Sequence, residues 1–121
     1  MARIFGHSRK PTLALRQRKA WLLQQVAVPA DLLRASVVER FATCGKAQCH
    51  CHHGGSKHGP FYHLTQCLAV GKMNKFLLKT EDQRQMARSG VEHFRALQEQ
   101  LEELSQINAE LLRREERLLP E

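Results

Sequence analysis

Long apolar runs are missing from this sequence. No segment approaches the ~20 apolar residues of a membrane-spanning helix, and the first residues contain no apolar stretch of signal-peptide length. Aromatic residues are also few, with one Trp, one Tyr and five Phe among 121 residues. We therefore expect a cytoplasmic protein, nucleoid-associated if it binds DNA, with no contact to membranes. We also expect a thin core that benefits from a metal or covalent staple.

Acidic residues are scarce in the first 90 positions. That part carries four acids against fifteen Lys and Arg, whereas residues 91–121 carry eight Glu against four Arg. The basic part suits DNA, or RNA, and the acidic part suits a solvated helix face or a protein contact. An excess of charge that only keeps the protein soluble is the alternative. Acids are absent from the cysteine-rich segment, unlike in magnesium-dependent nucleases and transposases, so we predict that the protein is not an enzyme.

Cysteine and histidine are concentrated in "CGKAQCHCHHGGSKHGPFYH", residues 44–63, which holds three Cys and five His. Thiols stay reduced in the cytoplasm, so such a cluster favours a metal over disulfides. The spacing predicts a closed, structural Zn²⁺ site made by Cys44, Cys49, Cys51 and His58. An iron–sulfur cluster would usually ask for four cysteines at other spacings. Alternatives for the fourth ligand are His52, His53, His63 and Cys67.

Glycines accompany the predicted ligands. We expect Gly45 to free the backbone after the first ligand, and Gly54 and Gly55 to let the loop return to present His58.

The hydrophobic pattern predicts an α+β fold. We expect a helix with one basic side over residues 11–27, a strand leading from residue 36 into Cys44, and a hairpin over residues 61–80 that turns at Gly71. Thr80 is a predicted N-cap for a helix that runs from Glu81 to Leu118. We expect three parts: a basic arm and helix at 1–35, mobile over residues 1–10 until bound, a zinc-knuckle β domain of about three strands at 36–80, and a long helix at 81–121.

Apolar residues recur every three or four positions along this last helix, as in a coiled coil. An Asn at a core position commonly fixes register and favours two strands. The pattern therefore predicts a homodimer, although the same stripe could instead pack on the N-terminal helix and sheet of its own chain. The predicted dimerisation residues are Phe94, Leu97, Leu101, Leu104, Asn108 and Leu111.

Basic side chains in three regions are predicted to bind nucleic acid: the N-terminal helix and arm, the cysteine-rich loop and the hairpin. Phe61 and Tyr62 are interleaved with them, and either ring could stack on a base or cover the metal site as part of the core. The predicted nucleic-acid-binding residues are Arg3, Arg9, Lys10, Arg16, Arg18, Lys19, Lys46, Lys57, Lys72 and Lys75.

The runs "VVERFATCGKAQCHC" and "HGPFYHL", followed by a helix with "LEELSQINAELLR", carry a resemblance that covers residues 36–113. They resemble a bacterial domain family of unknown function with a Cys-Gly-Lys-x-x-Cys-x-Cys and His-Gly-Pro-aromatic signature, whose members are often encoded near transposases. The resemblance supports the four ligands more than any activity.

Together these features predict a zinc-stabilised, dimeric DNA-binding accessory protein of a mobile genetic element. The alternative is an adaptor that binds a transposase or recombinase through the zinc knuckle and the acidic helix.

Overall fold

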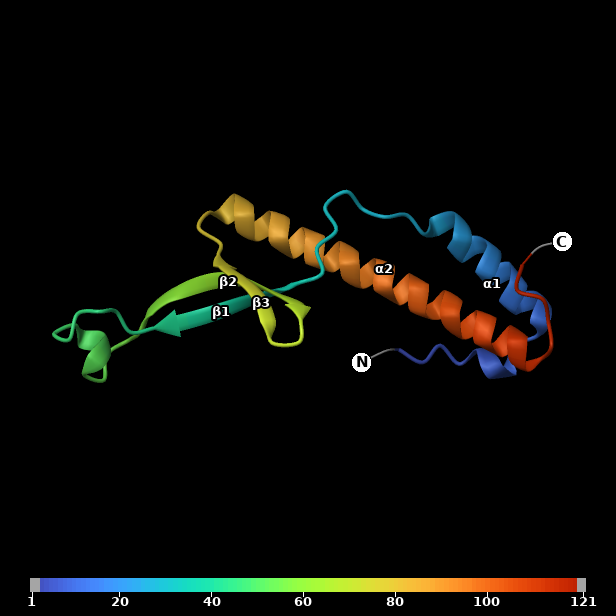
Figure 1. Ribbon diagram of the computed structural model, residues 1–121, viewed down its shortest axis with the longest axis horizontal. Helices are drawn as coiled ribbons and strands as arrows, with labels where there is room; N and C mark the ends of the chain where they lie inside the picture. Colours follow the sequence, from blue (N-terminus) through green and yellow to red (C-terminus); the bar gives the residue numbers. More distant parts are fainter. Residues whose placement is uncertain (1–2, 120–121) are drawn as a thin grey trace. The chain divides into compact units, whose positions relative to one another are not determined.

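The computed structural model describes residues 3–119 and confirms the α+β fold (Figure 1). In chain order its elements are η1 (His7–Arg9), α1 (Thr12–Gln25), β1 (Ser36–Ala42), η2 (His50–His52), β2 (His58–Ala69), β3 (Lys72–Leu77) and α2 (Glu81–Arg113). None of the helices within these described residues is both long enough and apolar enough to cross a membrane.

The three strands form one antiparallel sheet in the order β1-β2-β3. Leu64 of β2 lies between Val37 of β1 and Phe76 of β3 in the register of the sheet. Gly71 makes the turn between β2 and β3 with a φ of 75°, a left-handed conformation that glycine adopts without steric cost. The predicted strand and hairpin are therefore confirmed.

The chain divides into two compact units. The helical unit consists of residues up to Ala30 and from Phe94 on, and the sheet unit consists of Asp31–His93. Helix α2 contributes residues to both units. The sequence predicted divisions after residues 35 and 80. The boundaries differ because α1 and the later turns of α2, which are far apart in the sequence, share one core.

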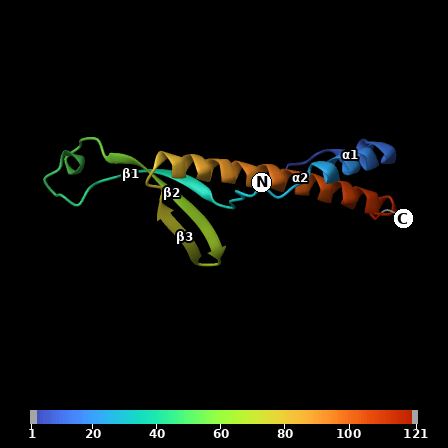
Figure 2. The same ribbon diagram turned by 90° about the horizontal axis from the view of Figure 1, so that it is seen from above.

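The sheet unit buries one face of its sheet, which we call the inner face, against the first turns of α2 (Figure 2). Tyr62 lies at the edge of this core, and the guanidinium carbons of Arg84 and Arg88 each lie 5.1 Å from the centre of its ring. Cation–π contacts of this kind hold Tyr62 against α2. The core consists of Leu64, Leu78 and Ala87, with Leu33, Ala35, Val37 and Tyr62 packed around it.

The helical unit has its own core, in which Leu15 and Leu22 of α1 contact Ile107 and Leu111 of α2. All four side chains are at most 1% exposed. Leu15 and Leu22 are seven residues apart, so they lie on the same face of α1. Packing of the α2 stripe on the N-terminal helix, the alternative to a coiled coil, therefore describes this part of the stripe.

The arm before α1 packs on α2 from residue 3 on, whereas residues 1–2 lie outside the described part of the chain. The backbone N–H of Phe5 donates to Oε1 of Gln106 over 3.1 Å, and Nε2 of Gln106 donates to the carbonyl of Arg3 over 2.6 Å. His7 is 5% exposed. Because of these contacts, the expectation of a mobile arm is wrong for residues 3–10. The contacts join residues about 100 positions apart, and no local pattern in the sequence indicates them.

Helix α2 begins at the predicted capping residue. The N–H of Gln83 donates to Oγ1 of Thr80 over 3.1 Å, and Oε1 of Gln83 accepts from the N–H groups of Lys79 and Thr80. This reciprocal arrangement is a capping box, which satisfies the free N–H groups of a first helical turn.

The same helix ends at Arg113, five residues before the predicted end at Leu118. Glu115 has a φ of 61°, the N–H of Glu116 donates to the carbonyl of Leu111 over 2.8 Å, and the N–H of Glu115 donates to that of Leu112 over 2.9 Å. This is a Schellman motif, which usually has glycine at the left-handed position. Because Glu occupies that position here, the sequence carried no stop signal.

Candidate metal centre and basic surface

The cysteine-rich segment forms a loop that leaves β1 after Ala42 and returns to β2 at His58, beyond the ends of the two strands (Figure 1). The N–H of Cys49 donates to the carbonyl of Lys46 over 3.0 Å. The short helix η2 follows, and its central residue, Cys51, is 6% exposed. Two consecutive turns therefore bring the second and third cysteines back toward the first.

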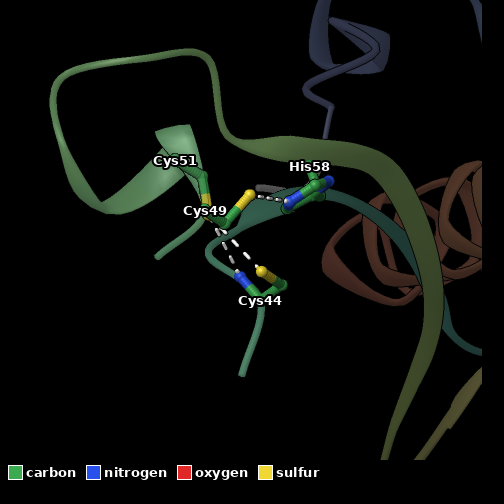
Figure 3. Close-up of side chains that lie close together, drawn as sticks. All are labelled: Cys44, Cys49, Cys51 and His58. Atoms are coloured by element: carbon green, nitrogen blue, oxygen red, sulfur yellow. Dashed lines mark hydrogen bonds between the residues drawn. The ribbon is translucent and has the colours of Figure 1, made fainter. Parts of the chain in front are cut away.

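The four predicted ligands converge in this loop (Figure 3). Their Sγ atoms and the His58 nitrogen all lie within 4.8 Å of one another. The Sγ atoms of Cys44 and Cys51 are 3.7 Å apart, and Sγ of Cys49 lies 3.3 Å from Nε2 of His58. The four cysteines of the chain, including Cys67, form no disulfide among the described residues.

These distances fit a tetrahedral metal. Bond lengths of ~2.3 Å to sulfur and ~2.0 Å to nitrogen give tetrahedral edges of roughly 3.8 Å between sulfurs and 3.5 Å between sulfur and nitrogen. The two short distances observed differ from these edges by a few tenths of an ångström. Three thiols and one imidazole are thus close enough to hold a metal ion, and such a donor set is typical of closed, structural sites.

Hydrogen bonds and burial separate the acidities of two of the thiols. The backbone N–H of Cys51, together with the imidazole of His58, lowers the pKa of the Cys49 thiol to about 6. The backbone N–H of Cys44 donates to the Cys51 sulfur and lowers the pKa of that thiol. Burial and the neighbouring sulfurs raise the same pKa by more, so the pKa of Cys51 is raised overall. Stabilising all three sulfurs as thiolates in one place requires a cation.

Glycine is required on the return side of the loop. A Cβ on Gly55 would lie 2.7 Å from the carbonyl oxygen of His50, and Gly54 has a φ of 84°. The expected role of these two glycines is therefore supported. Gly45 has neither a left-handed backbone nor any atom near the position of a Cβ, so it does not serve the geometry as expected.

The alternative ligands all lie outside the cluster. Nε2 of His52 lies 2.7 Å from the carbonyl oxygen of Cys44, and Nε2 of His53 lies 3.0 Å from the carbonyl oxygen of Ala47. Both rings therefore form hydrogen bonds to the loop backbone. His63 pairs with Val38 and Leu77 in the sheet. Cys67 is exposed on β2.

Most of the predicted nucleic-acid-binding cations of the helical unit are engaged within the chain. Arg18 forms two hydrogen bonds to the buried carboxylate of Glu103, of 2.7 and 2.9 Å, and lowers its pKa. Nε2 of His7 lies 3.2 Å from the same carboxylate. The remaining contacts are Arg3 with Glu99, Lys10 with the ring of His7, Arg16 with Glu116 and the carbonyl of Arg117, and Lys19 with the carbonyl of Leu118.

These contacts were missed because charge counted along a sequence does not show which acid folds back onto which base. Glu103 and Glu116 form ion pairs with Arg18 and Arg16 of α1, and the carbonyls of Arg117 and Leu118 accept from Arg16 and Lys19. Of the six cations predicted in this region, Arg9 alone is exposed without a side-chain contact among the described residues.

The predicted cations of the sheet unit are different. Lys46 and Lys57 of the metal loop and Lys72 and Lys75 of β3 are exposed, and none of their amino groups forms an ion pair or hydrogen bond within residues 3–119. Arg40 of β1 is equally exposed and unpaired there, and the sequence prediction omitted it. In "SVVERFA", Arg40 lies two positions after Val38, and residues at this spacing share one face of a strand. This spacing was the signal that could have placed Arg40 on the sheet surface.

The predicted dimerisation stripe is largely used inside the chain. Leu111 is fully buried, Leu97 is 8% exposed and Leu104 packs against the helical core. Phe94 and Asn108 are partly buried, and Leu101 is 49% exposed. The structure does not confirm a coiled coil, and the homodimer stays a prediction.

In a comparison with protein-family models, residues 12–67 match a "Domain of unknown function (DUF6788)". The match agrees with the expected resemblance to a family of unknown function. It includes α1 and the metal loop and stops within β2, whereas we expected residues 36–113. No curated protein and no solved structure matches the chain.

Proposed function

We propose that the protein is a zinc-stabilised DNA-binding accessory protein that contacts nucleic acid through its sheet unit. Zinc would be held by Cys44, Cys49, Cys51 and His58 and would act structurally, since all four tetrahedral positions are then filled by the protein. It would fix the loop that carries Lys46 and Lys57 at the ends of β1 and β2.

The location of unpaired positive charge carries this proposal. Lys46, Lys57, Lys72 and Lys75 are exposed without an internal counter-charge among the described residues, whereas five of the six predicted cations of the helical unit contact an acid or another polar group of the chain. A cation that is already paired must break that contact before it binds phosphate, but an unpaired one only releases phosphate counterions. We therefore assign the contact to the sheet unit and not to the basic N-terminal helix.

Fluorescence anisotropy with labelled DNA of arbitrary sequence tests this assignment. For the zinc-loaded protein, the logarithm of the binding constant should fall linearly with the logarithm of salt between roughly 50 and 200 mM. Lys72→Ala with Lys75→Ala should weaken binding to every sequence alike and reduce the salt slope by about 1.8 on a duplex or about 1.4 on a single strand, because two phosphate contacts are lost.

The matched control is Arg9→Ala with Arg95→Ala, which removes two exposed charges from the helical unit. It should leave the salt slope nearly unchanged. An equal loss in both variants would mean that only net charge matters, and wild-type protein that binds neither DNA nor RNA at low salt would refute the proposal.

An adaptor function is the second candidate, favoured by large apolar side chains exposed on the sheet unit. Phe41, Leu68, Val70 and Met73 are all more than half exposed, between 51% and 103%. Exposed apolar side chains of this kind can mark contacts with another protein. The resemblance to a family encoded near transposases makes a transposase or recombinase the partner to test, and such binding should be insensitive to salt.

A further inference from the structure

The face of the sheet that does not pack on α2, which we call the outer face, has a definite composition. In an antiparallel sheet, directly paired residues share a face and alternate residues change face. Leu64 and Tyr62 belong to the inner face, so their neighbours Phe61 and His63 belong to the outer one. By the same register, its six central residues are Val38, Arg40, Phe61, His63, Lys75 and Leu77.

This outer face is open and carries only positive charge. Val38, Phe61 and Leu77 are 44%, 38% and 39% exposed, which is high for apolar residues in the middle of a sheet. Arg40 and Lys75 are exposed and have no ion pair within residues 3–119. The one acid of β1, Glu39, pairs with Tyr62 and so belongs to the inner face.

The two neighbouring aromatic residues of β2 therefore have separate roles. Tyr62 is held between the sheet and α2 by Arg84 and Arg88. Phe61 instead presents its ring on the outer face and pairs directly with Arg40 of β1. The Cβ atoms of directly paired residues lie about 5 Å apart, so the ring of Phe61, which could stack on a base, and the side chain of Arg40, which could reach the adjoining phosphate, start from neighbouring points of the outer face.

From this juxtaposition we infer that the outer face binds single-stranded nucleic acid, with Phe61 stacking on one base and Arg40 and Lys75 contacting phosphates. The inference rests on the proposed function and names its substrate class. Phe61 and Thr65, the partner of Lys75, are four residues apart on β2, which separates the two cations by roughly 13 Å along the strand. That span suits two or three nucleotides of a single strand laid across a sheet.

A single strand fits this face better than a duplex does. Stacking on a side chain requires an unstacked base, and bases in a duplex are stacked on each other. The apolar neighbours Val38 and Leu77 suit the faces of bases, whereas a phosphate backbone alone would gain nothing from them. An acidic, apolar protein surface or a second copy of this chain would also match the face chemically, so the experiment must separate these occupants.

The test compares Phe61→Leu with Phe76→Leu in the full-length, zinc-loaded protein. Phe76 is 45% exposed on the inner side of the same sheet, so the second variant makes the same chemical change away from the outer face. The probes are a labelled oligothymidine of about 15 nucleotides and a DNA duplex of equal length, measured by anisotropy. Circular dichroism melting of each variant reports the fold independently of binding.

We expect the wild type to bind the single strand at least as tightly as the duplex. Phe61→Leu should weaken single-strand binding by about 5-fold to 100-fold without changing its salt slope, Phe61→Tyr should restore it, and Phe76→Leu should leave it near wild type. Arg40→Ala should reduce the slope by about 0.7, the value for one contact to a single strand.

Other outcomes overturn the inference. Equal effects of Phe61→Leu and Phe76→Leu, or a clear preference for the duplex, would do so while leaving the proposed function intact. A Phe61→Leu variant that only dissociates a dimer in sedimentation would assign the outer face to a second copy. Wild-type protein that binds neither probe would overturn the proposed function itself.

Discussion

Gly90 shows how one missing methyl group can decide whether two segments pack. It lies inside α2, where glycine disfavours a helix by about 1 kcal/mol relative to alanine. A Cβ at this position would lie 2.4 Å from the carbonyl oxygen of Asp31 and 2.9 Å from Cβ of Leu33. The N–H of Leu33 donates to the carbonyl of Gly90 over 3.2 Å. The segment around Asp31 and Leu33 therefore packs directly on the backbone of α2 within the sheet unit.

Gly90→Ala should therefore destabilise the protein although it improves helix propensity. Overpacking against a backbone oxygen costs about 1–3 kcal/mol, and the better helix propensity of alanine offsets about 1 kcal/mol of that cost, so we expect a net loss of up to about 2 kcal/mol. Urea unfolding followed by circular dichroism measures it. The control is Ser105→Ala on an exposed position of α2, which should be neutral or slightly stabilising. A stabilised Gly90→Ala variant would show that the segment around Asp31 moves aside freely.

Glu115 is the second residue whose backbone, not its side chain, determines the local structure. With a φ of 61° it occupies the left-handed position of the Schellman motif, where a non-glycine residue is strained. Glu115→Gly should stabilise the protein by about 0.5–1 kcal/mol in the same unfolding experiment.

Removal of the charge alone must be distinguished from relief of the backbone. Glu115→Ala also removes an acid from the unfavourable, C-terminal end of the helix dipole, worth a few tenths of a kcal/mol, but keeps the strain. If alanine stabilised as much as glycine, charge and not conformation would be the cause.

At the scale of elements, the sequence predicted those features that depend on neighbours along the chain. The start of α2 was predictable because Thr80 and Gln83 form a capping box within four residues. The strands were predictable from alternation, and the metal cluster was predictable because three of its ligands lie within eight residues and the loop is short.

Features that depend on distant partners were not predictable in the same way. Arg18 looked available to DNA because Glu103, its partner, lies 85 residues away. The α2 stripe indicated a coiled coil because Leu15 and Leu22, which cover part of it, belong to a helix whose own apolar residues show no clear single face. The end of α2 escaped prediction because Glu replaces the usual glycine of its turn.

At the scale of the whole molecule, two cores with no shared member stabilise two units. The metal loop belongs to the sheet unit, and Cys51 is its one buried residue between Ala42 and His58. A loop with so little buried surface cannot fix its own conformation by the hydrophobic effect. The proposed zinc would supply that stabilisation, since structural zinc commonly contributes on the order of 10 kcal/mol to the folding of small modules.

Removing the metal should therefore affect the two units unequally. Hydrogen exchange of the zinc-loaded protein with and without a strong chelator should show loss of protection in the metal loop and in the adjoining ends of β1 and β2. Amides near Leu15, Leu22, Ile107 and Leu111 should keep their protection, because their core contains no residue of the sheet unit.

Cys49→Ser should reproduce the chelated pattern and lose stoichiometric zinc, whereas Cys67→Ser, a cysteine outside the cluster, should do neither. Unchanged exchange after chelation would mean that the loop holds its shape without metal, and loss of protection throughout the chain would mean that the two units unfold as one.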